Sequence, residues 1–314
     1  MDNHVLDPKT FGKVAVLYGG RSSEREISLK SGATVLAALK RCDIDAYGID
    51  AGGDVLTQLA QGEYQRVFNV LHGRGGEDGL IQGALELLGL AYTGSGVLGS
   101  ALTMDKLLTK LVWQQLEFPT PCYMVVKAGA DLDTIIKKVG LPLAIKPVRE
   151  GSSIGISKVT NAEDLLAACE LGFKHDDMLL AEAWIKGGEY TAGVLGDEAL
   201  PLIHMETPHS FYDYQAKYLA DTTRYRCPCG LPEAQERAIA ALCWRAFKAV
   251  GASGWGRVDL MLDEARQPWL LEVNTIPGMT DHSLVPKAAA AAGIDLETLV
   301  MRILTTSLET KVGS

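Results

Sequence analysis

The sequence of 314 residues lacks the features that mark membrane, secreted and nucleic-acid-binding proteins. No stretch approaches the roughly 18 uncharged apolar residues of a membrane span, and the N-terminus is polar and acidic where a signal peptide would be basic and then apolar. Basic residues stand singly and the formal net charge is -9, which argues against nucleic acid or an anionic membrane as partner. The composition therefore predicts a cytoplasmic protein with a small-molecule ligand.

Cysteine is also scarce and follows no metal-site pattern. The six cysteines form no CxxC pair, and no histidine stands at the spacing of a zinc site. Reduced and mostly buried cysteines are the simpler interpretation, so neither a disulfide nor a zinc ion is expected. Cys227 and Cys229 are close in sequence, and the proline between them predicts a turn.

With 47% hydrophobic and 22% charged residues, the chain can build two or three domains with separate cores. In its first third, β-rich segments alternate with helical ones: strands over 13–20, 47–50 and 67–71, and helices over 24–40 and 80–89. This alternation predicts a small α/β domain with a parallel sheet over residues 1–105, whose strand-end loops carry ligands.

The pattern changes after residue 105. A helix, several strands and a glycine-rich hairpin are predicted in the order 107–115, 123–126, 143–159, 161–171 and 178–184. From Glu189 onward hairpins dominate, and a long helix follows from Pro232 to Val250. We therefore expect one α+β subdomain over 106–188 and another over 189–314. Residues 205–228 are aperiodic but rich in tyrosine, which favours an ordered lid.

Two strands near the C-terminus carry polar residues on one face. Because strand side chains alternate between faces, Arg257 and Asp259 point the same way. A turn centred on residues 265 and 266 would place Glu272 opposite Asp259 and Asn274 opposite Arg257. The core face would then hold Val258, Leu260, Leu271 and Val273.

Opposed carboxylates repel each other by a few tenths to about 1 kcal/mol unless a cation lies between them. Carboxylate and amide oxygens are hard donors that suit Mg²⁺ or Mn²⁺ completed by waters and phosphate oxygens. Asp259, Glu272 and Asn274 are therefore predicted metal ligands. The alternative is a solvated sheet face on which Arg257 is a salt-bridge partner.

A magnesium ion with an incomplete protein shell implies bound phosphates, and two glycine-rich segments are candidates for holding them. GSGVLG (94–99) matches GxGxxG, but no clear strand precedes it, so helix packing is the better interpretation. REGSSIG (149–155) follows Lys146 at the end of an apolar strand. Backbone amides of such a hairpin can close over a triphosphate, and a lysine in that strand is costly unless it is paired.

Several motifs occur in the order and spacing of ATP-grasp ligases, which the chain resembles. They are MDKLLTK (104–110), LAIKPVREGSSIGISKV, LLAEAWIKGGEYT, GWGRVDLML and LLEVNTIPGMTDHS. With GGRSSEREISL, LHGRGGEDG and FYDYQAKYL, the resemblance is to the D-alanine:D-alanine ligase family, from Val14 to Leu304. It implies an ATP-grasp fold, in which two α+β subdomains behind an N-terminal α/β domain clamp ATP. It also implies ATP-dependent joining of two D-alanines for peptidoglycan precursors, by a homodimeric enzyme.

The resemblance assigns roles to individual residues. Lys106 and Lys146 would contact the phosphates of ATP, Glu182 and the backbone at Trp184 and Ile185 the adenine, and Glu189 the ribose. Asp259, Glu272 and Asn274 would bind two Mg²⁺ or Mn²⁺ ions, with Glu272 bridging them. Ala183 stands where the family often has lysine, so one adenine contact would be absent or replaced.

The implied reaction transfers the γ-phosphoryl group of ATP to the first D-alanine, and the amine of the second then attacks the acyl phosphate. Arg257 and the amide of Gly278 would stabilise the oxyanion. The substrates would be held by Glu24 with Ser152 and Tyr218, by His72 and Lys217, and by Ser283 with Leu284.

Some of these residues also have a simpler interpretation. Glu24 stands where helix capping favours an acid, and Ser283 could cap the helix that follows it. Ser152 is typical of turn chemistry in a glycine-rich loop, and His72 is equally consistent with a packed histidine.

Alternative functions remain within and outside this class. A D-alanine:D-lactate or D-serine ligase, or another carboxylate–amine ligase of the ATP-grasp type, would share these motifs, although AKYL at Tyr218 favours an amine nucleophile. A nucleotide-binding regulator without activity would have lost a metal ligand or a phosphate lysine. A dinucleotide oxidoreductase would bind NAD through GSGVLG.

Overall fold

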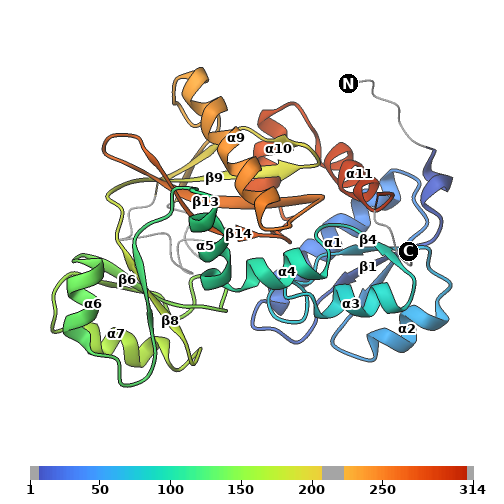
Figure 1. Ribbon diagram of the computed structural model, residues 1–314. Helices are drawn as coiled ribbons and strands as arrows, with labels where there is room; N and C mark the ends of the chain where they lie inside the picture. Colours follow the sequence, from blue (N-terminus) through green and yellow to red (C-terminus); the bar gives the residue numbers. More distant parts are fainter. Residues whose placement is uncertain (1–6, 207–222, 310–314) are drawn as a thin grey trace.

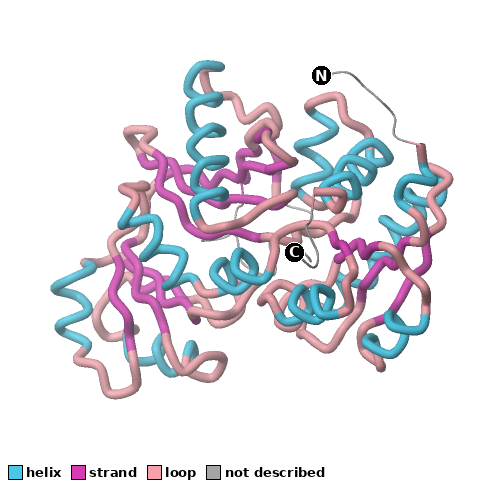
Figure 2. Tube along the Cα trace, turned by 45° about the vertical axis from the view of Figure 1, so that its right-hand side comes forward, coloured by secondary structure: helices cyan, strands magenta, loops and turns pink. Residues whose placement is uncertain are grey.

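The computed structural model describes residues 7–206 and 223–309, and Figure 1 traces the chain through them. Three separate sheets hold the strands, which form three groups in Figure 2. Most of the predicted lid, with Lys217 and Tyr218, lies outside the described residues.

The N-terminal sheet is parallel, as predicted, with the order β2-β1-β3-β4. Its strands are β1 (Val14–Tyr18), β2 (Ala46–Asp50), β3 (Arg66–Asn69) and β4 (Ala91–Tyr92). A 3₁₀ helix, η1 (Pro8–Phe11), precedes α1 (Arg25–Arg41), α2 (Val55–Gln61), α3 (Leu80–Leu87) and α4 (Val97–Met104). The sequence patterns missed α2, β4 and α4, since such short segments carry too few residues to show a period.

Both faces of this sheet are buried, and the chain end covers one of them. Val14 and Val16 of β1 point into one core, and Ala15 and Leu17 into another. The first core includes α1 together with α10 (Leu284–Ala291) and α11 (Leu296–Thr306). Helix α11 packs against both α1 and α10. Helices α10 and α11 therefore pack the N-terminal sheet against the C-terminal part of the chain.

The middle sheet is antiparallel and has the order β5-β8-β6-β7. Its strands are β5 (Tyr123–Val126), β6 (Leu143–Pro147), β7 (Ser157–Val159) and β8 (Leu179–Ala183). Helices α6 (Leu132–Val139) and α7 (Leu165–Gly172) pack against it around one apolar core. The predicted hairpin through the glycine-rich loop is confirmed, because β6 pairs with β7.

The third sheet has the order β12-β11-β9-β13-β14, with β10 beside β9. Its strands are β9 (Gly187–Leu195), β10 (Glu198–Ala199), β11 (Ile203–Glu206), β12 (Arg224–Arg226), β13 (Trp255–Asp263) and β14 (Pro268–Asn274). Helix α9 (Glu233–Ala249) covers it together with α5 (Lys106–Gln115). Trp113 of α5 is fully buried in this core, although α5 precedes the middle sheet in the chain.

The predicted register of the last hairpin is confirmed where it matters for the polar face. Asp259 pairs with Glu272, and Arg257 with Asn274. Beyond Asp259 the register shifts by one residue at a β-bulge, so Leu260 pairs with Leu270.

The prediction that Leu271 faces the core is therefore wrong. A bulge places two successive residues against one on the partner strand, so the alternation of faces is interrupted there. Leu270 is fully buried in its place, and Leu271 lines a pocket beside Glu272.

The GSGVLG segment serves close packing, as its sequence context predicted. A Cβ atom on Gly99 of α4 would lie 2.3 Å from the carbonyl oxygen of Gly251. At Gly254 a Cβ atom would lie 3.0 Å from the Cα atom of Gly94. These glycines let α4 and the loop before it approach the backbone that leads into β13.

Replacing Gly99 with alanine should lower the free energy of unfolding by roughly 1–3 kcal/mol, because the contacting carbonyl belongs to the backbone and cannot move aside cheaply. Gly83→Ala is the matched control in helix α3, where the nearest atom to the added Cβ lies at 3.8 Å. It should leave stability unchanged or raise it by up to about 1 kcal/mol. Urea unfolding checks both, and equal midpoints for the two variants would contradict the packing argument.

Candidate active site

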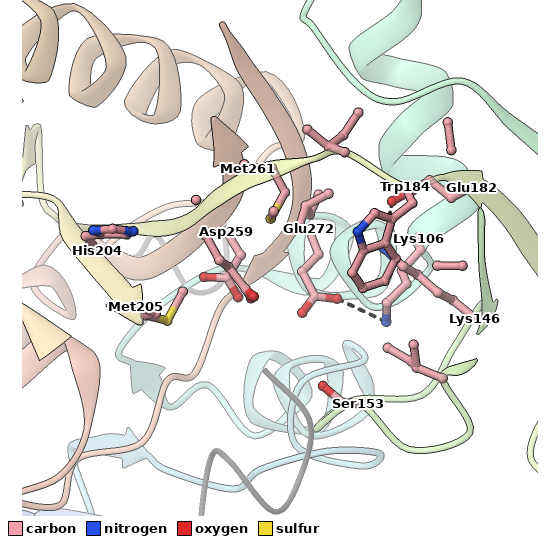
Figure 3. Close-up of a pocket in the computed structure, with 18 of the residues that line it drawn as sticks. Lys106, Lys146, Ser153, Glu182, Trp184, His204, Met205, Asp259, Met261 and Glu272 are labelled. Carbon is pink, nitrogen blue, oxygen red and sulfur yellow. Dashed lines mark hydrogen bonds and ion pairs between the residues drawn. The ribbon is translucent and has the colours of Figure 1, made fainter. Parts of the chain in front are cut away.

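Two pockets adjoin each other at the junction of the three sheets. The larger, of about 370 Å³, lies between the middle and third sheets (Figure 3). The smaller, of about 80 Å³, lies between loops of the N-terminal sheet, the glycine-rich loop and the end of β14. Lys106 and Glu272 line both pockets.

The larger pocket has an apolar part that suits a flat aromatic ring. Its apolar walls come from strands β6, β11, β13 and β14, from the residue before β7 and from the segment after β8: Ala144, Met205, Met261, Leu271, Ile156, Trp184 and Ile185. Lys158 lies on strand β7, and its ammonium is 4.3 Å from the centroid of the Trp184 ring. Glu189 lines the same pocket, on strand β9.

Glu182 is buried beneath this pocket between two lysines. Lys146 Nζ lies 2.6 Å from one carboxylate oxygen, and Lys110 Nζ lies 2.6 Å from the other. Burial opposes the charge on Glu182, yet the two ammonium groups outweigh it and hold the pKa of its carboxyl below the usual range. Burial lowers the pKa of Lys110, although Glu182 opposes that shift.

Lys110 was not among the predicted site residues. The signal for it was present, because Lys106 and Lys110 are four residues apart on one helix and so lie on the same face. The predicted adenine contact of Glu182 must share a carboxylate that both lysines already hold.

Lys106 connects the glycine-rich loop to the third sheet. Its ammonium donates to the carbonyl oxygen of Glu150 at 2.6 Å and lies 3.3 Å from a carboxylate oxygen of Glu272, the contact dashed in Figure 3. Arg74 also holds this loop, by donating to the Glu150 carboxylate at 3.1 and 3.2 Å.

Asp259 is held by side chains from its own sheet. Arg257 Nε and Nη2 each donate to one Asp259 oxygen at 2.8 Å, and the Thr191 hydroxyl donates at 2.6 Å. Arg257 is thus a salt-bridge partner, as the alternative predicted, although Asp259 is buried and does not lie on a solvated face. The two opposed carboxylates of the hairpin are each balanced by a cation, Asp259 by Arg257 and Glu272 by Lys106.

The predicted metal ligands share one face of the hairpin, and two of them, Asp259 and Glu272, form ion pairs with Arg257 and Lys106. In the part of the chain that the structure describes, no three His, Cys, Asp or Glu side chains form a metal-binding group. Asn274 Oδ1 accepts from the Ile276 amide at 3.0 Å, and its second lone pair stays available. Two carboxylates and an amide oxygen fit a hard divalent cation, provided that Arg257 moves away from Asp259.

Glu24 and Ser152 meet in the smaller pocket, although 128 positions separate them. Ser152 Oγ donates to Glu24 Oε1. Glu24 is the N-cap residue of α1, but its side chain makes no capping hydrogen bond, so the capping alternative does not describe it. Ser152 has a φ of 52°, in the left-handed region that costs a non-glycine residue energy and that tends to occur at functional sites.

His72 lines the smaller pocket with both ring nitrogens engaged. Nδ1 donates to the carbonyl of Ile276 at 2.8 Å, because a carbonyl only accepts, and Nε2 accepts from the Ser31 hydroxyl at 3.1 Å. Ser31 Oγ in turn accepts from the Met279 amide at 3.1 Å. The packed-histidine alternative therefore describes the structure, and His72 braces the loop that contains Gly278.

The loop after β14 brings Gly278 and Ser283 together. A Cβ atom on Gly278 would lie 2.7 Å from Ser283 Oγ, so a larger residue would displace that hydroxyl. Ser283 is the N-cap residue of α10, but its hydroxyl accepts from the Thr280 amide at 3.0 Å and caps no helical amide. Leu284 opens the helix.

Within the described residues, no helix is long and apolar enough to cross a membrane.

Comparison with protein families covers most of the chain. Residues 112–305 match the family described as "D-ala D-ala ligase C-terminus", and residues 13–66 and 55–95 match "D-ala D-ala ligase N-terminus". The chain is 56% identical over 306 residues to D-alanine–D-alanine ligase of Ectopseudomonas mendocina, covering 98% of both chains. It is 57% identical over 303 residues to the Stutzerimonas stutzeri enzyme of the same name, covering 96% of both.

Solved structures agree with these matches. D-alanine–D-alanine ligase of Bacillus anthracis complexed with ATP is 31% identical, with a TM-score of 0.82 over 95% of this chain and 97% of that one. VanG D-Ala:D-Ser ligase of Enterococcus faecalis is 30% identical, with a TM-score of 0.81 over 94% of this chain and 99% of that one.

Ser31→Ala should destabilise the protein, because it leaves His72 Nε2 and the Met279 amide without their buried partner. A loss of roughly 1–3 kcal/mol in the free energy of unfolding is expected. Thr34→Ala, a hydroxyl removal on the exposed side of the same helix, is the control and should change little. Thermal unfolding measures both, and an equal effect of the two changes would argue against the His72 brace.

Proposed function

The chain belongs to the D-alanine–D-alanine ligase family, and on this premise we propose that the larger pocket holds ATP and the smaller one the amino-acid substrates. The enzyme is an ATP-dependent ligase that joins two D-alanines for cell-wall peptidoglycan synthesis. One observation carries the assignment of the pockets: Lys106 and Glu272 line both of them. The γ-phosphate of ATP would lie at that junction, within reach of a substrate carboxylate.

In the larger pocket, adenine would pack between the apolar side chains, with Met261 and Leu271 on one side. The backbone at Trp184 and Ile185 and the carboxylate of Glu182 would recognise its edge, and Glu189 would bind the ribose. Lys106 and Lys146 would contact the phosphates under the glycine-rich loop. The bulge at Leu271 supports this arrangement, because it supplies an apolar surface directly before the polar Glu272.

Asp259, Glu272 and Asn274 would hold two Mg²⁺ or Mn²⁺ ions, as the resemblance to the family implies. They could do so only after Arg257 has left Asp259. When bound, the metal neutralises phosphate charge. Arg257 would then be released toward the smaller pocket, which it also lines. Its guanidinium could there meet the oxyanion that forms on the substrate carbonyl.

In the smaller pocket, Glu24 would bind the ammonium of the first D-alanine, supported by Ser152. The substrate carboxylate attacks the γ-phosphorus, ADP leaves, and an acyl phosphate forms. The amine of the second D-alanine attacks that carbonyl, loses a proton, and phosphate leaves. Gly278 would donate its amide to the oxyanion, and Ser283 with the amide of Leu284 would bind the second carboxylate.

Most of these residues bind and orient, because the chemistry needs no covalent protein intermediate. Holding two reactants in line can lower the activation barrier by roughly 7 to 11 kcal/mol. His72 would act through the loop of Gly278 that it braces. Tyr218 and Lys217 would complete the site from the segment outside the described residues.

We also propose three domains, over residues 1–105, 106–188 and 189–314. We propose a cytoplasmic location, where ATP is available, and a homodimer. Support for the dimer comes from α3 and α4, which lie against each other and expose Leu80, Leu87 and Leu98. Helix α4 contains no charged residue, so two copies could meet along it without like-charge repulsion. The one charged residue of α3, Glu86, accepts a hydrogen bond from the Tyr92 hydroxyl at 2.7 Å.

Purified protein should release phosphate from ATP when D-alanine is added, because the acyl phosphate forms only on a bound carboxylate. A phosphate assay and mass analysis of the dipeptide measure this, with L-alanine as the control. Mixtures of D-alanine with D-serine or D-lactate test which acceptor the enzyme uses, because mass analysis distinguishes the products. Absence of stimulation by every D-amino acid would refute the proposed use of the pockets.

The double change Leu87→Glu and Leu98→Glu should convert a dimer to monomers, because four carboxylates would meet across a two-fold axis. Leu166→Glu on α7, another exposed leucine, is the control and should leave the mass unchanged. Light scattering after size-exclusion chromatography gives the masses. A dimer that persists in the double variant would exclude this surface.

A further inference from the structure

Lys110 is a buried charge that the reaction described above does not use. Its side chain is 1% exposed and does not line the ATP pocket, whereas that of Lys146 is 15% exposed and does. Lys110 Nζ also donates to Thr120 Oγ1 at 2.7 Å. The Thr120 hydroxyl donates in turn to the carbonyl of Leu270 at 3.0 Å.

The charges around Glu182 do not balance. Within this trio one carboxylate faces two ammonium groups, so the trio by itself carries a net charge of about +1, although the carboxylates of Glu272 and Glu189 also attract Lys146. Buried ion pairs are a poor source of stability, since apolar residues of similar volume often do as well. A function in the site therefore explains the extra lysine better than stability does.

The position of the extra charge indicates that function. Lys106 and Lys146 line the ATP pocket, and each lies close to one carboxylate, Glu272 and Glu182 respectively. Without Lys110, Glu182 would hold Lys146 alone and neutralise it fully. With Lys110 on the far side, the carboxylate is shared, and positive charge remains on the pocket side, where Figure 3 shows Lys146.

We propose that Lys110 is a positioning residue for ATP, which balances Glu182 from beneath the pocket so that the ammonium of Lys146 stays available to the phosphates. This inference rests on the proposed placement of ATP in the larger pocket. The inference concerns the phosphates alone, because Lys110 does not line the pocket, whereas Trp184 and Ile185 do.

The variant Lys110→Met tests the proposal. Calorimetry measures its affinity for ADP with Mg²⁺ and its affinity for adenosine, and the ratio of the two affinities is compared with that of the original protein. The affinity for ADP should fall about tenfold, the size of one charge-assisted hydrogen bond, while adenosine binding is retained. A merely structural role would weaken both ligands by the same factor. That equal loss would overturn the proposal.

Glu182→Gln in the same chain supplies the rescue. In the double variant Lys110→Met with Glu182→Gln, the buried group again has a net charge of about +1, and the ADP-to-adenosine affinity ratio should return toward that of the original protein. Glu182→Gln in the Lys106→Met background is the control, because Lys106 pairs with Glu272. There the ratio should change much less, and an equal gain in both backgrounds would contradict the proposal.

Lys110→Gln is the second variant if the methionine change prevents folding, since it keeps a donor toward Thr120 and removes only the charge. The same fall in the ADP-to-adenosine ratio is expected, and an unchanged ratio would overturn the proposal. Dipeptide formation by the original protein tests the proposed function separately. An active enzyme whose ratio is insensitive to Lys110 would refute the inference alone.

Discussion

The opposition of Asp259 and Glu272 across the β13–β14 ladder is the constraint on which the site depends. Two carboxylates at this separation need positive charge, and the structure supplies it with Arg257 and Lys106. These cations come from different places, one from the same strand and one from helix α5. The carboxylate pair therefore connects the third sheet to the helix and to the glycine-rich loop that Lys106 also contacts.

The architecture brings three independent sheets to that constraint. Helix α11 packs against α1 and α10, and the residues of all three helices share one core, which holds Glu24 near the end of β14. The braced histidine, His72, adds a polar link between the first sheet and the Gly278 loop. A small polar pocket and a larger, partly apolar one thus share an edge, which is the arrangement a carboxylate and a nucleotide need in order to react.

Local pattern predicted much of this and failed where the backbone departs from regular geometry. The parallel sheet, the glycine-rich hairpin and the pairing of Asp259 with Glu272 follow from alternation and turn residues. The bulge after Asp259 does not, because nothing in the sequence marks where a strand gains a residue, and Leu271 therefore changes face. Lys110 was missed for another reason, since a lysine in a helix ordinarily lies at the surface.

The sequence by itself determined which groups are available: the hard oxygen ligands, the lysines, the glycine-rich loop and the order of strands and helices. Only the tertiary structure decided their partners. It joins Ser152 to Glu24, turns Arg257 onto Asp259, and buries Glu182 between two lysines. The physical reason is that periodicity acts over a few residues, whereas charge pairing depends on which distant segments the packed cores bring within hydrogen-bonding distance.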